Sequence, residues 1–126
     1  MYSHNMVGSN DLERSRRFYD AVFGALGAEP GRLDPKGRLV YTHNGGRFVV
    51  TTPIDGNPAT AGNGCTIGFA MDGPEQADAW HKAGVEAGGT SIEDPPGVRE
   101  AAGHRMYLAY LRDPDGHKLC ALHPLG

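Results

Sequence analysis

The sequence predicts a single α+β domain in which two β-α-β-β-β units in tandem form curled mixed sheets around a cleft. An order of short strand, amphipathic helix and further short strands occurs twice within 126 residues. A polar loop rich in Gly and Pro, residues 54–63, separates the two occurrences. Each expected helix ends at a glycine, Gly27 or Gly88, where a left-handed C-terminal cap is typical. We therefore expect one module at about 1–53 and a second at about 64–126.

The first half reads as a strand, a helix and three strands. A short strand over 2–8 is followed by Ser9-Asn10-Asp11, whose side chains are typical of a helix N-terminus. The segment 12–26 places apolar residues at helical spacing. Two glycine-containing turns, at 34–37 and 44–46, then divide the remainder of this half into three strands.

The second half repeats this order. Pro74 stands where the first turn of a helix tolerates proline, and Trp80 lies on the inner stripe of that helix, so we expect it in the core. The segment 94–103 reads as a long loop. The strands of this half are expected at 65–72, 90–94, 105–111 and 117–123.

Composition and charge exclude several classes of protein. Twelve Lys and Arg against fifteen Asp and Glu give a formal charge of −3 without a dense basic stripe, which argues against a nucleic-acid partner. No apolar run approaches the roughly 20 residues that span a bilayer, and no secretory signal begins the sequence. Two cysteines without a CxxC spacing suit a reducing compartment. We expect a cytoplasmic protein that acts on neither nucleic acid nor membrane.

The tandem repeat identifies four strand positions that would face a shared cleft. Aligning the two halves at their helix ends makes His4 equivalent to Thr66 and Val50 equivalent to Cys120. Hairpin loops of different length leave the second match open to slippage, in which case Thr51 replaces Val50. If a pseudo-twofold axis relates the halves, these side chains meet in the cleft.

Three markers give the chain a resemblance to a known superfamily. They are His4 on the first strand, the phrase 11–15 leading to Phe18-Tyr19, and the segment 113–118, which reads Asp-Pro-Asp-Gly-His-Lys before the last strand. With these markers in this order, the chain resembles the vicinal oxygen chelate superfamily, the glyoxalase/bleomycin resistance/extradiol dioxygenase group. The resemblance implies the fold predicted above, a loop at 94–103 that covers the cleft, and a homodimer.

The resemblance also implies a divalent metal held by His or Glu at the four strand positions. His4 matches the first of these ligands, whereas Val50 or Thr51 replaces a carboxylate, Thr66 a second His, and Cys120 a Glu. A His/Cys pair favours zinc over magnesium, but two ligands alone hold no metal well. Without the Glu, the base expected for glyoxalase chemistry is also missing.

We therefore expect the protein to bind a small organic molecule in its cleft without a complete metal site, and we assign no catalytic residue. One alternative is a metal-dependent lyase, isomerase or dioxygenase of the lactoylglutathione lyase type, with His4 and Cys120 as an atypical zinc site. Another is a dimeric module whose cleft is vestigial. In that case apolar side chains would fill the cleft, namely Met6, Val50, Phe69 and Leu122.

Further side chains are candidates to shape a ligand site. Tyr41, Tyr110 and Arg105 join His4, Thr66 and Cys120 in this set, since an Arg can bind a carboxylate or phosphate in bidentate fashion. Cys120 has three interpretations, namely a small packed residue, a thiolate activated by His4, and a metal ligand. Cys65 precedes Thr66 and should point the opposite way on its strand, into the core.

Overall fold

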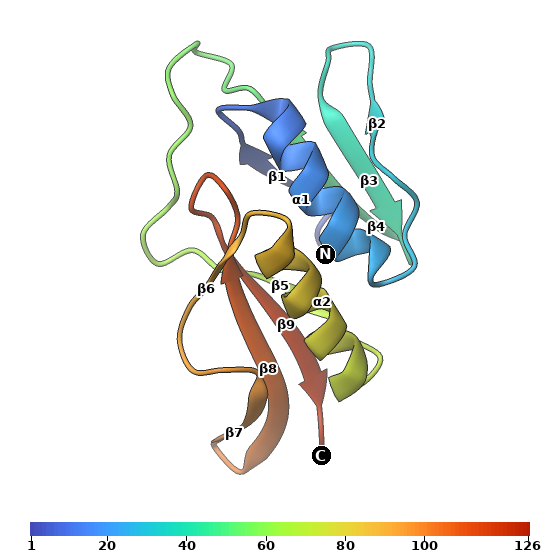
Figure 1. Ribbon diagram of the computed structural model, residues 1–126, viewed down its shortest axis with the longest axis vertical. Helices are drawn as coiled ribbons and strands as arrows, with labels where there is room; N and C mark the ends of the chain where they lie inside the picture. Colours follow the sequence, from blue (N-terminus) through green and yellow to red (C-terminus); the bar gives the residue numbers. More distant parts are fainter.

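The computed structural model describes all residues from Met1 to Gly126, and two β-α-β modules divide them. Figure 1 shows the first module at the top and the second below it. The elements of the first are β1 (Asn5–Gly8), α1 (Leu12–Gly24), β2 (Arg32–Leu33), β3 (Leu39–His43) and β4 (Gly46–Thr51). Those of the second are β5 (Ile67–Ala70), α2 (Pro74–Glu86), β6 (Thr90–Ser91), β7 (Gly97–Ala101), β8 (His104–Arg112) and β9 (Lys118–Pro124).

Each module forms its own mixed sheet. The first has the strand order β1-β4-β3-β2, and the second has β5-β9-β8-β6 with β7 also pairing with β8. The pairs β1–β4 and β5–β9 are parallel, and the other pairs are antiparallel. The α+β class and the mixed sheets predicted from the sequence are confirmed.

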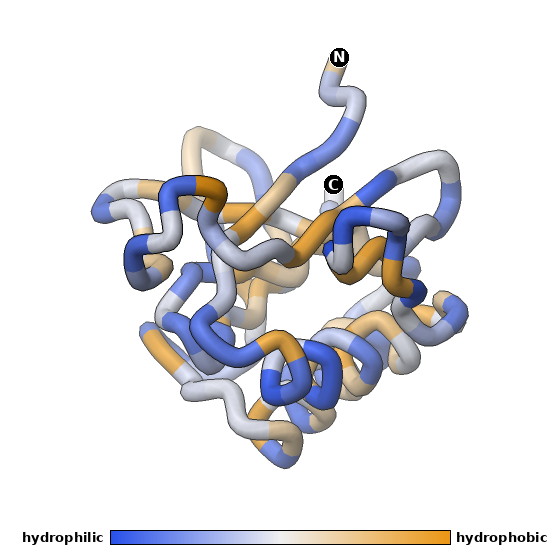
Figure 2. The backbone as a smooth tube through the Cα atoms, turned by 90° about the horizontal axis from the view of Figure 1, so that it is seen from above, coloured by the Kyte–Doolittle hydropathy of each residue, from blue (hydrophilic) through white to orange (hydrophobic).

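Both helices lie on the same side of the two sheets. They stand in front of the strands in Figure 1 and along the lower side of the molecule in Figure 2. A core of 16 buried residues fills the space between helices and sheets and draws on both modules. We call this side of the sheets the helix face and the opposite side the open face. Trp80 is fully buried in this core, as expected.

Local chemistry explains most element boundaries. The side chain of Asp11 accepts a hydrogen bond from the backbone N–H of Arg14 and so caps α1. Gly27 and Gly88 follow the two helices with φ of 85° and 104°, as the sequence predicted. Asn44 and Gly45, with φ of 47° and 79°, supply the positive angles that a tight β3–β4 hairpin requires. Neither helix is long and apolar enough to cross a membrane.

The segment 94–103 is not the open loop expected from the sequence. Residues 97–101 form β7, which pairs with β8 through a turn in which Ala102 and Gly103 have φ of 50° and 78°. The guanidinium of Arg99 donates hydrogen bonds to the carbonyls of Asp94 and Pro95 and so ties the start of the hairpin. The long loop expected over 94–103 was therefore wrong, because residues 97–101 are a paired strand.

The Asp113–Gly116 turn joins the second module to the first. The buried carboxylate of Asp113 accepts a hydrogen bond of 2.5 Å from the hydroxyl of Tyr19 on α1. It also accepts hydrogen bonds from the backbone N–H groups of Asp115 and His117, and these bonds fix the turn. We call this hydrogen-bond network the clamp, because it joins two segments about a hundred positions apart in the sequence.

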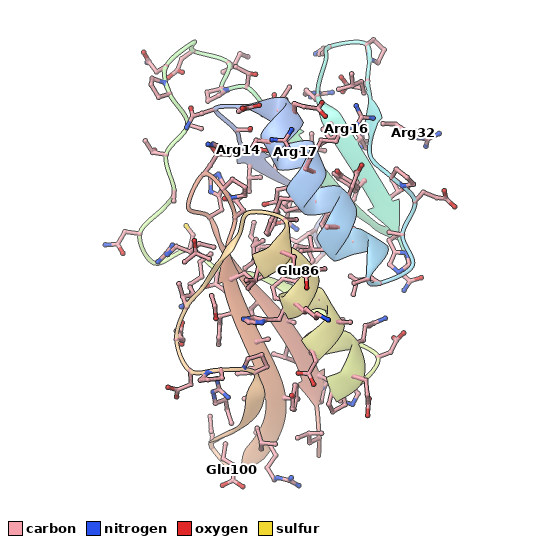
Figure 3. The ribbon with its side chains drawn as sticks, in the orientation of Figure 1. Arg14, Arg16, Arg17, Arg32, Glu86 and Glu100 are labelled. Carbon is pink, nitrogen blue, oxygen red and sulfur yellow. The ribbon has the colours of Figure 1, made fainter.

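Asp115 extends the clamp to the start of α1. Its carboxylate lies 2.9 Å from the guanidinium of Arg14, which Figure 3 labels near the start of that helix, and it accepts the backbone N–H of Asn10. On the other side of the turn, Nε2 of His117 lies 2.7 Å from the carbonyl oxygen of Gly8 at the end of β1. These contacts hold the end of β1 and the start of α1 against the turn that precedes β9.

Candidate functional site

Cys120 lies on the open face of the second sheet. It pairs across the strands with Tyr110 on one side and Gly68 on the other, so all three share this face. Only 5% of Cys120 is exposed. A Cβ atom built at Gly68 would meet no other atom within 4 Å, so the space beside Cys120 is open.

The surroundings of Cys120 favour the protonated thiol. Burial raises the pKa of Cys120 above its ordinary value, and the carboxylate of Glu93 adds to this rise. The hydroxyl of Tyr110 and the ammonium of Lys118 act in the opposite direction. Lys118 is itself paired with Glu93, and its ammonium lies 4.9 Å from the centre of the Tyr110 ring. The cation beside this thiol is therefore Lys118, and it does not overcome burial.

The two cysteines should differ in reactivity because only Cys65 is exposed. This exposure contradicts the expectation that Cys65 lies in the core, since the residue precedes β5 instead of belonging to it. At pH 8 we expect iodoacetamide to alkylate Cys65 at least ten times faster than Cys120, because the thiolate reacts and Cys120 is buried with a raised pKa.

Peptide mass spectrometry at successive times measures both rates. In Cys65→Ser the remaining thiol should react slowly in buffer and readily in urea. Equal rates for the two cysteines of the native protein would contradict this assignment.

His4, Thr66 and Val50 do not join Cys120 in a common cluster. His4 is exposed just before β1, and its Nδ1 lies 2.8 Å from the Ser3 hydroxyl. Thr66 is exposed before β5 and lines an open cavity of about 590 Å³ together with Lys118. Val50 is fully buried on the helix face.

The register of the two modules differs by one residue from the sequence alignment. Met6 on β1 pairs with Val49, whereas Gly68, the corresponding residue of β5, pairs with Cys120. Val49 is therefore the counterpart of Cys120, and the proposed equivalence of Val50 was wrong. Because strand side chains alternate, a shift of one residue moves Val50 from the open face to the core.

These residues do not fit the divalent metal that the sequence resemblance implies. The four positions offer an exposed imidazole, a hydroxyl, a valine and a buried thiol whose pKa is raised. No group of three or more His, Cys, Asp or Glu side chains in the chain is placed to hold a metal ion. Since a catalytic zinc site needs about three protein ligands, His4 and Cys120 do not make one.

Tyr41 and Arg105 lie away from Cys120. Tyr41 is a core residue of the helix face, where its hydroxyl donates a hydrogen bond of 2.6 Å to Asp20. Arg105 approaches Glu100 to 3.8 Å, and Figure 3 shows Glu100 at the far end of the β7–β8 hairpin. Of the five other candidates from the sequence, the structure therefore pairs only Tyr110 with Cys120.

Two of the four side chains expected to fill a vestigial cleft lie elsewhere. Val50 is part of the helix-face core, and Phe69 packs against that core. Met6 and Leu122 share the open face with the buried residues Val49 and Cys120, and Met6 remains 42% exposed. The four side chains are therefore divided between the two faces of the sheets.

A cavity of about 300 Å³ lies instead where the two modules meet. Its walls are the C-terminal end of α1 with Phe23, the β3–β4 hairpin with Phe48, the strand β5 with Phe69, and Asn5. We call it the junction cavity. It arises from the stagger of two strands, because β1 starts opposite Phe48 and leaves the first two residues of β4 without a neighbour on that side.

The aromatic walls of the junction cavity hold one another in place. The ring centres of Phe23 and Phe69 are 5.3 Å apart, those of Phe23 and Phe48 are 5.4 Å apart, and those of Phe48 and Phe69 are 5.7 Å apart. Edge-to-face packing of this kind is favourable and rigid. Burial raises the pKa of Tyr41, and its hydrogen bond to Asp20 acts in the same direction, so this wall residue stays a neutral phenol. The cavity is therefore preformed.

Polar groups line part of the same cavity, namely Asn5, His43, Asn44 and Arg47. An apolar pocket with a few polar groups is the usual form of a small-molecule site. Among the residues that line the cavity, sequence reasoning named Tyr41 as a ligand-site candidate and Phe69 as a side chain that would fill a vestigial cleft. The stagger that opens the cavity depends on where β1 begins relative to β4.

The chain is similar to one broad family of proteins. The profile of the Glyoxalase/Bleomycin resistance protein/Dioxygenase superfamily matches residues 2–121. A glyoxalase/bleomycin resistance protein from Albidiferax ferrireducens T118 has 58% sequence identity and a TM-score of 0.93, with 98% of each chain covered. No functionally curated protein matches the sequence.

More distant structures share the fold. A glyoxalase/bleomycin resistance protein/dioxygenase family enzyme from Burkholderia phytofirmans PsJN has 19% identity and a TM-score of 0.73, with 95% of each chain covered. A glyoxalase-related enzyme from Fulvimarina pelagi has 22% identity and a TM-score of 0.70, with 97% of this chain and 87% of the other covered.

Proposed function

Because the chain belongs to the glyoxalase/bleomycin resistance protein/dioxygenase superfamily, we propose that it binds a small organic molecule in the junction cavity without a resident metal ion. The observation that carries this proposal is the cavity itself. It combines three interlocked phenylalanine rings with polar side chains from β3 and β4, and both modules contribute to its walls. Its volume of about 300 Å³ is at the lower end of the range typical of ligand sites.

The chemistry of the side chains supports binding over metal-assisted catalysis. Neither cysteine lines the junction cavity, and no carboxylate lines it either. The hydroxyl of Tyr41 is committed to Asp20. The cavity thus supplies apolar contact and hydrogen-bond donors, which suit retention of a ligand.

The homodimer expected from the sequence remains a prediction, which sedimentation at working concentration would check.

A cavity-blocking variant tests the proposal. Gly46 lines the junction cavity and lies two residues before Phe48 on β4, so a side chain there starts on the same face as the Phe48 ring. A Cβ atom at Gly46 meets only the carbonyl oxygen of His43, at 3.4 Å, so Gly46→Leu should fill part of the cavity without a serious clash. We expect this variant to weaken binding of phenylacetamide, a small neutral aromatic probe, at least tenfold. Amide shifts of β5 and of the β3–β4 hairpin during an NMR titration would report binding at the site.

Gly24→Leu is the matched control. Gly24 ends α1, has open surroundings and does not line the cavity, so the control should bind like the native protein. Native-like binding by Gly46→Leu would contradict the assignment of the site. If neither phenylacetamide nor phenylacetate perturbs these amides in the native protein, the proposed function itself fails.

A further inference from the structure

The ionisable side chains of the junction cavity carry no negative charge. Fourteen residues line it, and the ionisable ones are Tyr41, His43 and Arg47. Tyr41 is a neutral phenol, as its raised pKa shows. No Asp or Glu lines the cavity, although the chain as a whole carries a formal charge of −3. Arg47 is therefore the one lining residue with a permanent positive charge, and no carboxylate of the cavity opposes it.

Most arginines of the chain are engaged with partners of their own. Four make ion pairs with carboxylates, namely Arg14, Arg16, Arg38 and Arg105. Two others, Arg99 and Arg112, donate to backbone carbonyls. None of the six ion pairs of the protein involves Arg47.

Arg17 and Arg32 share this lack of an ion-pair partner, but neither lines the cavity. Figure 3 shows Arg17 on α1 and Arg32 at the outer edge of the first sheet. An unpaired arginine at the surface is ordinary, since water and salt satisfy it. Arg47 differs from these two because it stands at the wall of a preformed aromatic cavity.

The β3–β4 hairpin fixes the position of Arg47. Its backbone pairs with Thr42 on β3, one step from the tight Asn44–Gly45 turn. The neighbouring residue Phe48 is buried and contributes a ring to the cavity wall. Because strand side chains alternate, the Arg47 side chain starts on the side of β4 opposite to the Phe48 ring. It does so where β1 leaves the edge of β4 uncovered, and from this free edge Arg47 lines the cavity.

We propose that the ligand of the junction cavity is a small carboxylate with an aromatic or branched apolar body, an inference that rests on the proposed function. The body packs against Phe23, Phe48 and Phe69, and the carboxylate pairs with the guanidinium of Arg47. A planar guanidinium matches a carboxylate in bidentate fashion, and such charge-assisted hydrogen bonds are stronger than neutral ones. The amide of Asn5 or Asn44 supplies a further donor at the same wall.

Three probes of nearly equal size separate charge from shape. Phenylacetate is an anion, phenylacetamide is neutral, and phenethylamine is a cation, and all three carry the same ring. We expect phenylacetate to bind the native protein about tenfold more tightly than phenylacetamide, and phenethylamine to bind most weakly. Isothermal titration gives the affinities, and the amide shifts of β5 and of the β3–β4 hairpin give the location.

Arg47→Gln removes the charge and keeps a long polar side chain. In this variant the preference for phenylacetate should disappear, while the affinity for phenylacetamide stays within about twofold of native. Arg32→Gln is the matched control, since Arg32 is an exposed strand arginine of the same sheet without an ion pair or a place in the cavity. It should keep the preference in full.

The outcomes distinguish this inference from the proposed function. Equal binding of phenylacetate and phenylacetamide at the cavity would overturn the carboxylate assignment and leave small-molecule binding intact. A preference for phenylacetate that survives in Arg47→Gln would also overturn the assignment of the carboxylate to Arg47. Absence of binding by all three probes would overturn the proposed function as well.

Discussion

Replacing Asp113 with alanine is expected to lower the free energy of unfolding by roughly 3 kcal/mol. The carboxylate is the common acceptor for the hydroxyl of Tyr19 and for the backbone N–H groups of Asp115 and His117. Tyr19 is fully buried, so its hydroxyl would lose its partner in a place that water does not reach. Urea unfolding followed by circular dichroism measures the change.

A double-mutant cycle with Tyr19→Phe shows whether the clamp works as described. Removing the hydroxyl alone should cost about 1 kcal/mol, because Asp113 keeps its two backbone partners. Asp113→Ala should then cost less in the Tyr19→Phe background than in the native protein. Strictly additive effects would mean that the two residues are not coupled, contrary to the 2.5 Å contact between them.

Replacing Gly84 with alanine should destabilise the protein by roughly 2 kcal/mol, although alanine is the better helix former. Gly84 lies in α2 where that helix crosses α1. A Cβ atom there would overlap Leu111 and lie 3.0 Å from a methyl carbon of Val22. Both neighbours are fully buried, so little space is available for them to move.

Gly24→Ala provides the comparison for this effect. The same substitution at the end of α1 meets no atom within 4 Å, so only helix propensity remains. We expect it to be neutral or to stabilise by up to about 1 kcal/mol. Thermal and denaturant unfolding measures the stability of both variants. If Gly84→Ala proved as stable as Gly24→Ala, this account of the helix contact would be wrong.

The sequence predicts those parts of the fold that depend on local chemistry. The helix cap at Asp11, the glycines after both helices and the Asn44–Gly45 turn each follow from the preferences of a few adjacent residues. The hairpin strand β7 was missed because its stability comes from pairing with β8, whereas the prolines before it are typical of a loop.

The candidate site was harder to predict because it depends on register and strand ends. The sequence pattern placed Cys120 correctly on its strand, but a shift of one residue in the other module exchanged Val49 for Val50. The junction cavity depends on where β1 begins relative to β4, which no periodicity reveals. Tyr41 was expected to shape the cleft, but its side chain lies in the core of the helix face.

The central claim is that the protein binds its ligand in the junction cavity without a metal. The most direct test is isothermal titration of phenylacetate into protein freed of metal with a chelator, compared with the same protein after dialysis against zinc. The account predicts the same Kd in both samples and a loss of binding in Gly46→Leu. Binding that is absent from the metal-free protein, returns with zinc and persists in Gly46→Leu would contradict it.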